Sequence, residues 1–162
     1  MAHKALHKKK KHEVYQMKIR IMTIDDYEQV YSLWLNTPNM GLNNLDDSKE
    51  GIARYLARNP ESCFVAEKDS RIIGVILSGH DGRRGFIHHV AVDKDEQRQG
   101  IGAALVDTAM SALESEGINK VALVVFRYNE GGNAFWEKLG FIARDDLFYR
   151  NKAIKELTRI DT

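Results

Sequence analysis

Two glycines at the start of an expected helix form the strongest candidate binding site in this sequence. Gly100 and Gly102 follow a short apolar strand (residues 90–92) and a polar stretch (residues 93–99), and an apolar helical pattern begins at Ile101. The first turn of a helix has backbone N–H groups without intrahelical acceptors, and it carries the positive end of the helix dipole. Glycine also lets an anion approach the main chain closely. The spacing therefore predicts a phosphate site.

Two common phosphate loops do not fit this segment. The dinucleotide fingerprint needs Gly or Ala where Leu105 stands, and it follows its strand without a polar stretch. The P-loop needs Gly-Lys followed by Ser or Thr, which does not occur in the chain. The remaining pattern, Gln97-x-x-Gly100-x-Gly102 on a strand–turn–helix, resembles the acetyl-CoA pyrophosphate loop of the GNAT superfamily of N-acyltransferases. An ordinary strand-to-helix turn with two glycines is the alternative.

A second block strengthens this resemblance. Residues 129–141 read Asn-Glu-Gly-Gly-Asn-Ala-Phe-Trp-Glu-Lys-Leu-Gly-Phe. This run is similar to the family's closing element, in which an Asn after the fifth strand, a short helix and a terminal Gly-Phe follow one another. Together with an N-terminal strand and two helices, the likeness covers roughly residues 17–150. It implies an N-acetyltransferase that moves an acetyl group from acetyl-CoA to a primary amine by direct transfer in a ternary complex.

The resemblance also implies which residues hold the cosubstrate. The loop amides would bind the pyrophosphate, and the extended pantetheine would pair with the fourth strand like an added strand. Asn129 would bond the pantetheine, although its position equally allows a helix N-cap. The expected acetyl-CoA residues are Val90, Val92, Gln97, Arg98, Gln99, Gly100, Ile101, Gly102, Ala103, Asn129 and Trp136.

His88 and His89 are the candidate bases for deprotonating the amine. Neighbouring residues of a strand face opposite sides, so only one of the two can face the acceptor, and Phe86, His88 and Val90 share a face. In several amine-acetylating family members, the residues at the positions of Phe86 and His88 act as the base or hold a water relay. A His near its reference pKa can take a proton from an ammonium at neutral pH. A hydrogen-bonded structural histidine is the alternative for either residue.

Trp136 departs from the family pattern. Family members commonly have a Tyr there, and its phenol donates the proton to the leaving thiolate. An indole N–H can only donate a hydrogen bond, so we expect Trp136 to pack against the pantetheine end. Tyr149, our second catalytic candidate, Tyr128 or solvent would then supply the proton. The missing Tyr keeps a non-catalytic acyl-CoA-binding module or sensor open as an alternative, which turnover of any amine would exclude.

Hydrophobic periodicity predicts the elements that position these residues. The pattern indicates one α/β domain over residues 17–162 with a GNAT-like mixed sheet, helices on both faces and the order β-α-α-β-β-β-α-β-α-β. Turns at residues 69–70 and 81–82 make the central strands an antiparallel meander. The expected strands lie near residues 19–21, 63–67, 71–78, 85–92, 121–126 and 141–149, and the expected helices near residues 23–35, 48–58, 101–116 and 131–139. We expect the strand at 121–126 to be buried on both faces.

Composition limits the other classes of function. The size of 162 residues fits one domain, and 43% hydrophobic residues suffice for a core. The single Cys63 excludes an intrachain disulfide, and without a signal peptide or long apolar run we expect a cytoplasmic protein with no membrane contact. Three histidines in the first 16 residues have no partner cysteine or carboxylate cluster, so we expect no metal.

Charge is uneven along the chain. Residues 1–16, which we interpret as a disordered basic tail, hold five lysines against Glu13, a net +4, so the remainder carries −3 of the total of +1. A mildly acidic body suits a cationic amine, either a small molecule or a protein amine, and makes nucleic acid an improbable partner. Asp46, Asp47 and Glu50 could attract such an acceptor, although helix capping also explains Asp47 and Glu50. A homodimer is compatible with these features.

Overall fold

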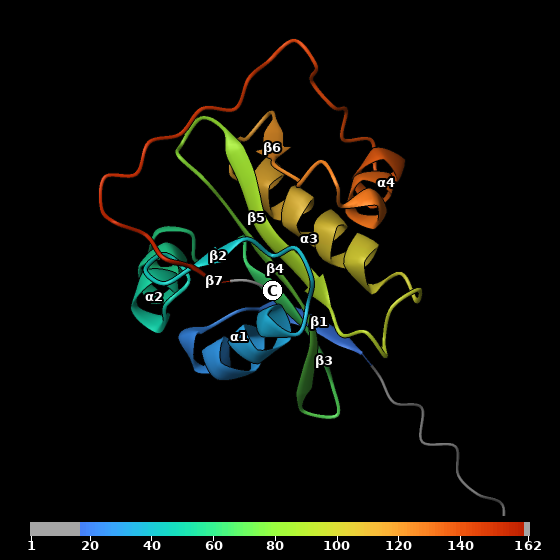
Figure 1. Cartoon of the computed structure of the whole chain (residues 1–162). Coiled ribbons are helices and arrows are strands. Elements are labelled where there is room, and N and C mark those ends of the chain that lie inside the picture. Colours follow the sequence, from blue (N-terminus) through green and yellow to red (C-terminus); the bar gives the residue numbers. More distant parts are fainter. Residues whose placement is uncertain (1–16, 161–162) are drawn as a thin grey trace, which may run out of the picture.

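A five-stranded sheet forms the centre of the molecule (Figure 1). The computed structural model describes residues 17–160, so the basic stretch 1–16 lies outside the described residues. The strands lie in the order β1 (Lys18–Ile21), β3 (Phe64–Lys68), β4 (Arg71–His80), β5 (Gly85–Val92) and β6 (Val121–Leu123). All neighbours are antiparallel except β5 and β6, which are parallel. The predicted mixed sheet with an antiparallel meander is confirmed.

Helices cover both faces of this sheet, as the periodicity predicted (Figure 1). One face packs against the 3-10 turn η1 (Ile24–Asp26) and the helices α1 (Tyr27–Leu35) and α2 (Lys49–Arg58), and the other packs against α3 (Ile101–Ser115) and α4 (Glu130–Lys138). The turn η1, which leads into α1, begins where the capping pattern predicted, because the Asp26 carboxylate accepts the Thr23 N–H at 2.9 Å. α2 begins at Lys49 after its N-cap Ser48, whose Oγ accepts the Gly51 N–H at 3.0 Å.

The central strand β4 contributes to both apolar cores. Val75 and Leu77 belong to the core under α1 and α2, and Ile76 belongs to the core under α3. Trp34 from α1 and Leu105 from α3 are fully buried against the two faces. Burying one such side chain contributes about 1.5–3 kcal/mol, so this pattern holds the sheet firmly between its helices.

The segment after α4 differs from the prediction. The expected strand at residues 141–149 does not form, because a turn at residues 145–146 interrupts it and Arg144 pairs with Asp146 at 2.7 Å. Aspartate is disfavoured in strands, and two stand in sequence at this point. The last strand is instead β7 (Arg159–Ile160), which pairs with β2 (Leu42–Asn43) in a separate two-stranded sheet. In Figure 1 the intervening chain runs from α4 over the top of the molecule toward α2.

The strand at residues 121–126 is also shorter and less buried than predicted. It ends at Leu123, and the Val124 side chain is 55% exposed. Only Val121 and Leu123 pack against the α3 core. Since β6 is the last strand of the sheet, no strand among the described residues shields its outer edge.

Candidate active site

A β-bulge in β5 sets the orientation of both candidate histidines. Leu77 lies opposite His89 and Ser78 lies opposite Ile87, so His88 is the extra residue of the bulge. The bulge breaks the alternation of side chains along the strand. His88 contacts the Tyr55 ring and His89 contacts Asp47, so both histidines face the layer of α1 and α2. The prediction that they face opposite sides was therefore wrong, and Val90 packs against the α3 core instead of sharing the face of His88.

The His88 imidazole lies among aromatic rings while keeping contact with solvent. Its centroid is 5.3 Å from that of Tyr55, edge to face, and 4.7 Å from that of Phe86. Desolvation by the surrounding protein, and secondarily the neighbouring His89, lower the pKa of His88 below its reference value. A lowered pKa keeps this ring neutral at pH 7, which is the state that can accept a proton.

His89, unlike His88, lies in a buried pair with a carboxylate. Its Nε2 lies 2.7 Å from Asp47 Oδ1, and about nine-tenths of both side chains is buried. The second carboxylate oxygen of Asp47 accepts the Asn43 N–H at 2.7 Å, and the Trp34 ring packs 5.0 Å from the imidazole. This carboxylate therefore neither caps α2, as we had allowed, nor is it open to an acceptor.

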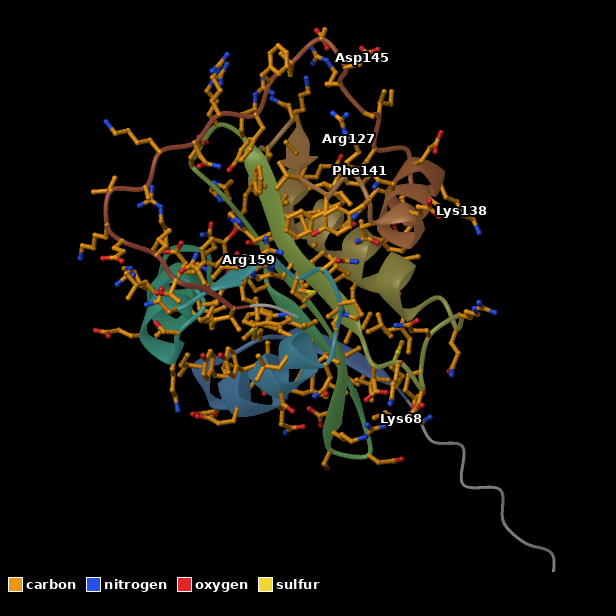
Figure 2. All side chains as sticks on the ribbon, in the orientation of Figure 1. Lys68, Arg127, Lys138, Phe141, Asp145 and Arg159 are labelled. Carbon is orange, nitrogen blue, oxygen red and sulfur yellow. The ribbon has the colours of Figure 1, made fainter. Side chains whose placement is uncertain are left out.

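The turn before α3 has the backbone expected of an anion site. Gly100 has a left-handed φ of 78°, and within the described chain no protein acceptor pairs with the backbone N–H groups of residues 97–103. The preceding loop is fastened by Glu96, which is 8% exposed and pairs with Lys68 at 3.2 Å and Arg71 at 3.5 Å. Figure 2 labels Lys68 beside the hairpin of β3 and β4. Ion pairs thus hold the loop while its amides stay free.

An open strand edge leads from this turn to His88. β6 pairs with β5 only at residues 85–87. Because the Asp93 N–H donates to Ile73 O, the alternation of an antiparallel pair directs the backbone groups of Val90 and Val92 to the edge away from β4. The Val92 carbonyl accepts Gln97 Nε2 at 3.1 Å on that side. An extended chain can therefore pair with this edge.

The second sequence block, residues 129–141, packs against the core under α3. Asn129 Oδ1 accepts the Gly132 N–H at 2.9 Å, which makes it the N-cap of α4. The half-buried Trp136 ring lies edge to face between Phe135, at 4.9 Å, and Phe141, at 5.0 Å. Figure 2 labels Phe141 and Lys138, which lie after and at the end of α4.

Gly102 has a packing role that the sequence did not indicate, beside its predicted place in the acetyl-CoA loop. A Cβ atom at this position would lie 3.3 Å from the Phe135 ring, so Gly102 lets α4 approach α3 closely. A Cβ atom at Gly100 would meet open space, and Gly100 is exposed whereas Gly102 is half-buried. The aromatic residue in the second block was the signal in the sequence that could have separated these roles.

A pocket of about 310 Å³ opens beside His88, between α2, the hairpin of β4 and β5, and β6. Tyr55, Phe86 and His88 form its aromatic part. Tyr149 does not line this pocket, since it lies in the irregular segment 142–158 with 70% of its surface exposed. Tyr128 is 63% exposed and stacks on Phe126. The structure therefore unites the loop, the strand edge, His88 and a pocket, but it does not add Tyr149.

Comparison with known proteins shows the class to which this fold and site belong. The chain matches the acetyltransferase (GNAT) family over residues 27–141, and it belongs to that family. An acetyltransferase of Sodalis glossinidius is 31% identical over 140 residues, covering 86% of this chain and 97% of the relative. An acetyltransferase of Pectobacterium atrosepticum is also 31% identical, with coverage of 86% and 98%.

Solved structures share the fold. The PaiA N-acetyltransferase of Thermoplasma acidophilum, in complex with coenzyme A, superposes with a TM-score of 0.70 at 22% identity, covering 80% of this chain and 92% of that one. An aminoglycoside acetyltransferase from an uncultured soil sample, in complex with sisomicin, gives a TM-score of 0.66 at 20% identity, with coverage of 86% and 97%.

Two further observations concern the described residues alone. No helix within residues 17–160 has the length and apolar character needed to cross a membrane. The same part of the chain contains no group of three or more His, Cys, Asp or Glu side chains placed to hold a metal ion.

Proposed function

We propose that this protein transfers an acetyl group from acetyl-CoA to a primary amine by direct attack within a ternary complex. The observation that carries the proposal is the position of His88 at the bulge of β5, where the open strand edge meets the pocket. The structural relative bound to coenzyme A and the one bound to an aminoglycoside support the same pair of substrates.

The cosubstrate would occupy one end of β5. The free amides of residues 97–103 suit a pyrophosphate, because they combine unpaired donors with the N-terminus of α3. Val90 and Val92 offer backbone groups to an extended pantetheine, as in β-strand addition. Gln97, Arg98 and Gln99 flank the path, and the half-buried Trp136 packs close to α3.

The acceptor would occupy the pocket at the other end of β5. A primary ammonium gives a proton to the neutral His88 ring, and the amine nitrogen then attacks the thioester carbonyl carbon. The C–N bond forms, the nitrogen loses its second proton as the C–S bond breaks, and the departing thiolate takes a proton, so that one proton remains on His88 and passes to solvent. We keep Tyr149 as the proposed donor of that proton, with solvent as the competing source.

The test compares His88→Ala with His89→Ala in a panel of primary amines and peptides, following the release of free CoA with a thiol reagent. Cys63 is buried with its pKa raised to about 12, so the protein's own thiol does not react in this assay. Losing a general base costs about a hundredfold or more in rate, and we expect this loss for His88→Ala. Tyr149→Phe in the same assay tests the proton donor.

The pH dependence provides a second readout. Since the pKa of His88 is lowered, its ring stays neutral between pH 7 and the reference value of about 6.5, and the wild-type rate should be constant over that range. At lower pH the ring becomes protonated and the rate should fall. His88→Ala should lose this acidic limb, whereas His89→Ala should keep it. Equal and small effects of both substitutions on rate and pH profile would return His88 to a structural role.

A further inference from the structure

The pocket beside His88 has a cationic rim. Arg58 ends α2, Arg84 precedes β5 and Lys120 precedes β6, and all three line the pocket. No ion pair joins any of them to a carboxylate within residues 17–160. These uncompensated charges gather at one site although the sequence after residue 16 has a net charge of −3.

The other charged groups of the pocket lining only partly offset this rim. Asp81 is the one carboxylate in the lining that the structure describes, and its Oδ1 already accepts the N–H groups of Arg83 at 2.8 Å and Arg84 at 2.7 Å. These backbone hydrogen bonds lower the pKa of Asp81. The Nε2 atom of His80 contacts the Glu116 carboxylate. The pocket therefore has an excess of positive charge.

The wall that carries these cations is tightly built. Asn59 is 4% exposed, and its Oδ1 accepts the His80 N–H at 2.9 Å, which ties the end of α2 to the end of β4. A Cβ atom on Gly79 would lie 2.4 Å from Asn59 Cγ, so only glycine allows this contact. The pocket is thus a fixed part of the fold with His88 at its aromatic side.

We infer that the acceptor of this acetyltransferase is an amine that also bears an anionic group, a carboxylate or a phosphate. This inference rests on the proposed function. An ammonium alone would be repelled by the rim, whereas an attached anion would pair with Arg84, Arg58 or Lys120 while the amine reaches His88. It differs from the expectation, drawn from the mildly acidic body of the chain, that a cationic amine suits this protein.

Two matched substrate pairs test this inference and separate the two anions. One pair is γ-aminobutyrate and its primary amide, and the other is O-phosphoethanolamine and ethanolamine. We expect the anionic member of at least one pair to have a kcat/KM higher by about tenfold, through charge-assisted hydrogen bonds to the rim. The pair that shows the preference identifies carboxylate or phosphate.

Substitutions of the rim residues test whether the preference for an anionic substrate arises at the pocket. Arg84→Gln and Lys120→Gln should raise the KM of the anionic member, whereas kcat/KM of the member without the anion should rise or stay level, because the loss of a rim cation relieves its repulsion. Arg83→Gln is the matched control, because Arg83 is the neighbouring arginine but does not line the pocket. Equal rates within both pairs for the wild type, or identical effects of Arg84→Gln and Arg83→Gln, would overturn the inference while leaving the acetyltransferase proposal in place.

Failure of the proposed function gives a different result. If no amine in any pair or panel is acetylated, that proposal fails, and calorimetry on the same pairs decides the pocket's preference. Tighter binding of the anionic member that is lost in Arg84→Gln and kept in Arg83→Gln supports an anion-selective pocket. Equal binding of both members contradicts it.

Discussion

His88 and His89 show how one backbone irregularity separates two neighbouring residues of the same type. The bulge turns both rings toward α1 and α2, but His89 lies in a buried pair with Asp47 whereas His88 faces the pocket. Bulges are frequent next to active sites, where they re-aim a side chain. The chemistry we propose therefore depends on one extra residue in β5.

At the same scale, we predict that Trp136 contributes by packing. Its ring lies between Phe135 and Phe141 on the α3 core, and an indole N–H cannot act as an acid near neutral pH. Trp136→Phe should keep kcat within roughly tenfold at saturating acetyl-CoA, whereas Trp136→Ala should weaken acetyl-CoA binding by about 1–3 kcal/mol through lost apolar contact. A thousandfold fall in kcat for Trp136→Phe with affinity intact would show instead that the indole N–H stabilises the transition state.

At the scale of elements, the contact between α2 and β4 sets the shape of the pocket. We predict that Gly79→Ala destabilises the protein by about 1–3 kcal/mol, because its Cβ would overlap Asn59 in a buried site. Gly131→Ala is the matched control, since a Cβ there meets open space in α4, and its effect should stay within about 1 kcal/mol. Denaturant unfolding measures both. Equal changes in the free energy of unfolding would mean that the Asn59 contact carries no constraint.

The sequence predicted elements well where periodicity and caps agreed. The helix starting after Ser48, the meander through residues 63–92 and the turn at Gly100 all follow from local patterns that the structure confirms. The bulge at His88 could not be predicted, because alternation assumes an unbroken strand. The expectation of a strand at residues 141–149 was wrong for a related reason. Local apolar residues suggested a strand, but they have no partner strand in the described structure.

Only the part of the candidate site that depends on a local sequence motif could be predicted. Short motifs indicate the loop at residues 97–103, because an anion site of the predicted kind depends on backbone N–H groups and glycine. The cationic rim comes from Arg58, Arg84 and Lys120, which are separated by up to about 60 residues in the chain and carry no common motif. Only the tertiary fold brings such residues to one pocket.

At the scale of the whole molecule, β5 connects the two proposed substrate sites. Its first residues line the pocket, its last residue precedes the loop that leads into α3, and the bulge lies between them. Both apolar cores pack on the central strands, so binding at either end acts on one cooperative structure. A ligand that binds the folded state alone should therefore stabilise the entire domain.

We predict that acetyl-CoA raises the melting temperature of the protein through the loop at residues 97–103. At a concentration of one hundred times Kd, a ligand of the native state adds about 2.7 kcal/mol, which corresponds to a shift of about 5–10 °C in a domain of this size. Acetyl-pantetheine is the matched control, because it keeps the thioester arm that would pair with Val90 and Val92 but lacks the pyrophosphate that the free amides would bind. Thermal unfolding with each compound at the same concentration should give a clearly smaller shift for acetyl-pantetheine. Equal shifts would mean that the amides of the loop add nothing to binding, and the anion site at the start of α3 would have to be abandoned.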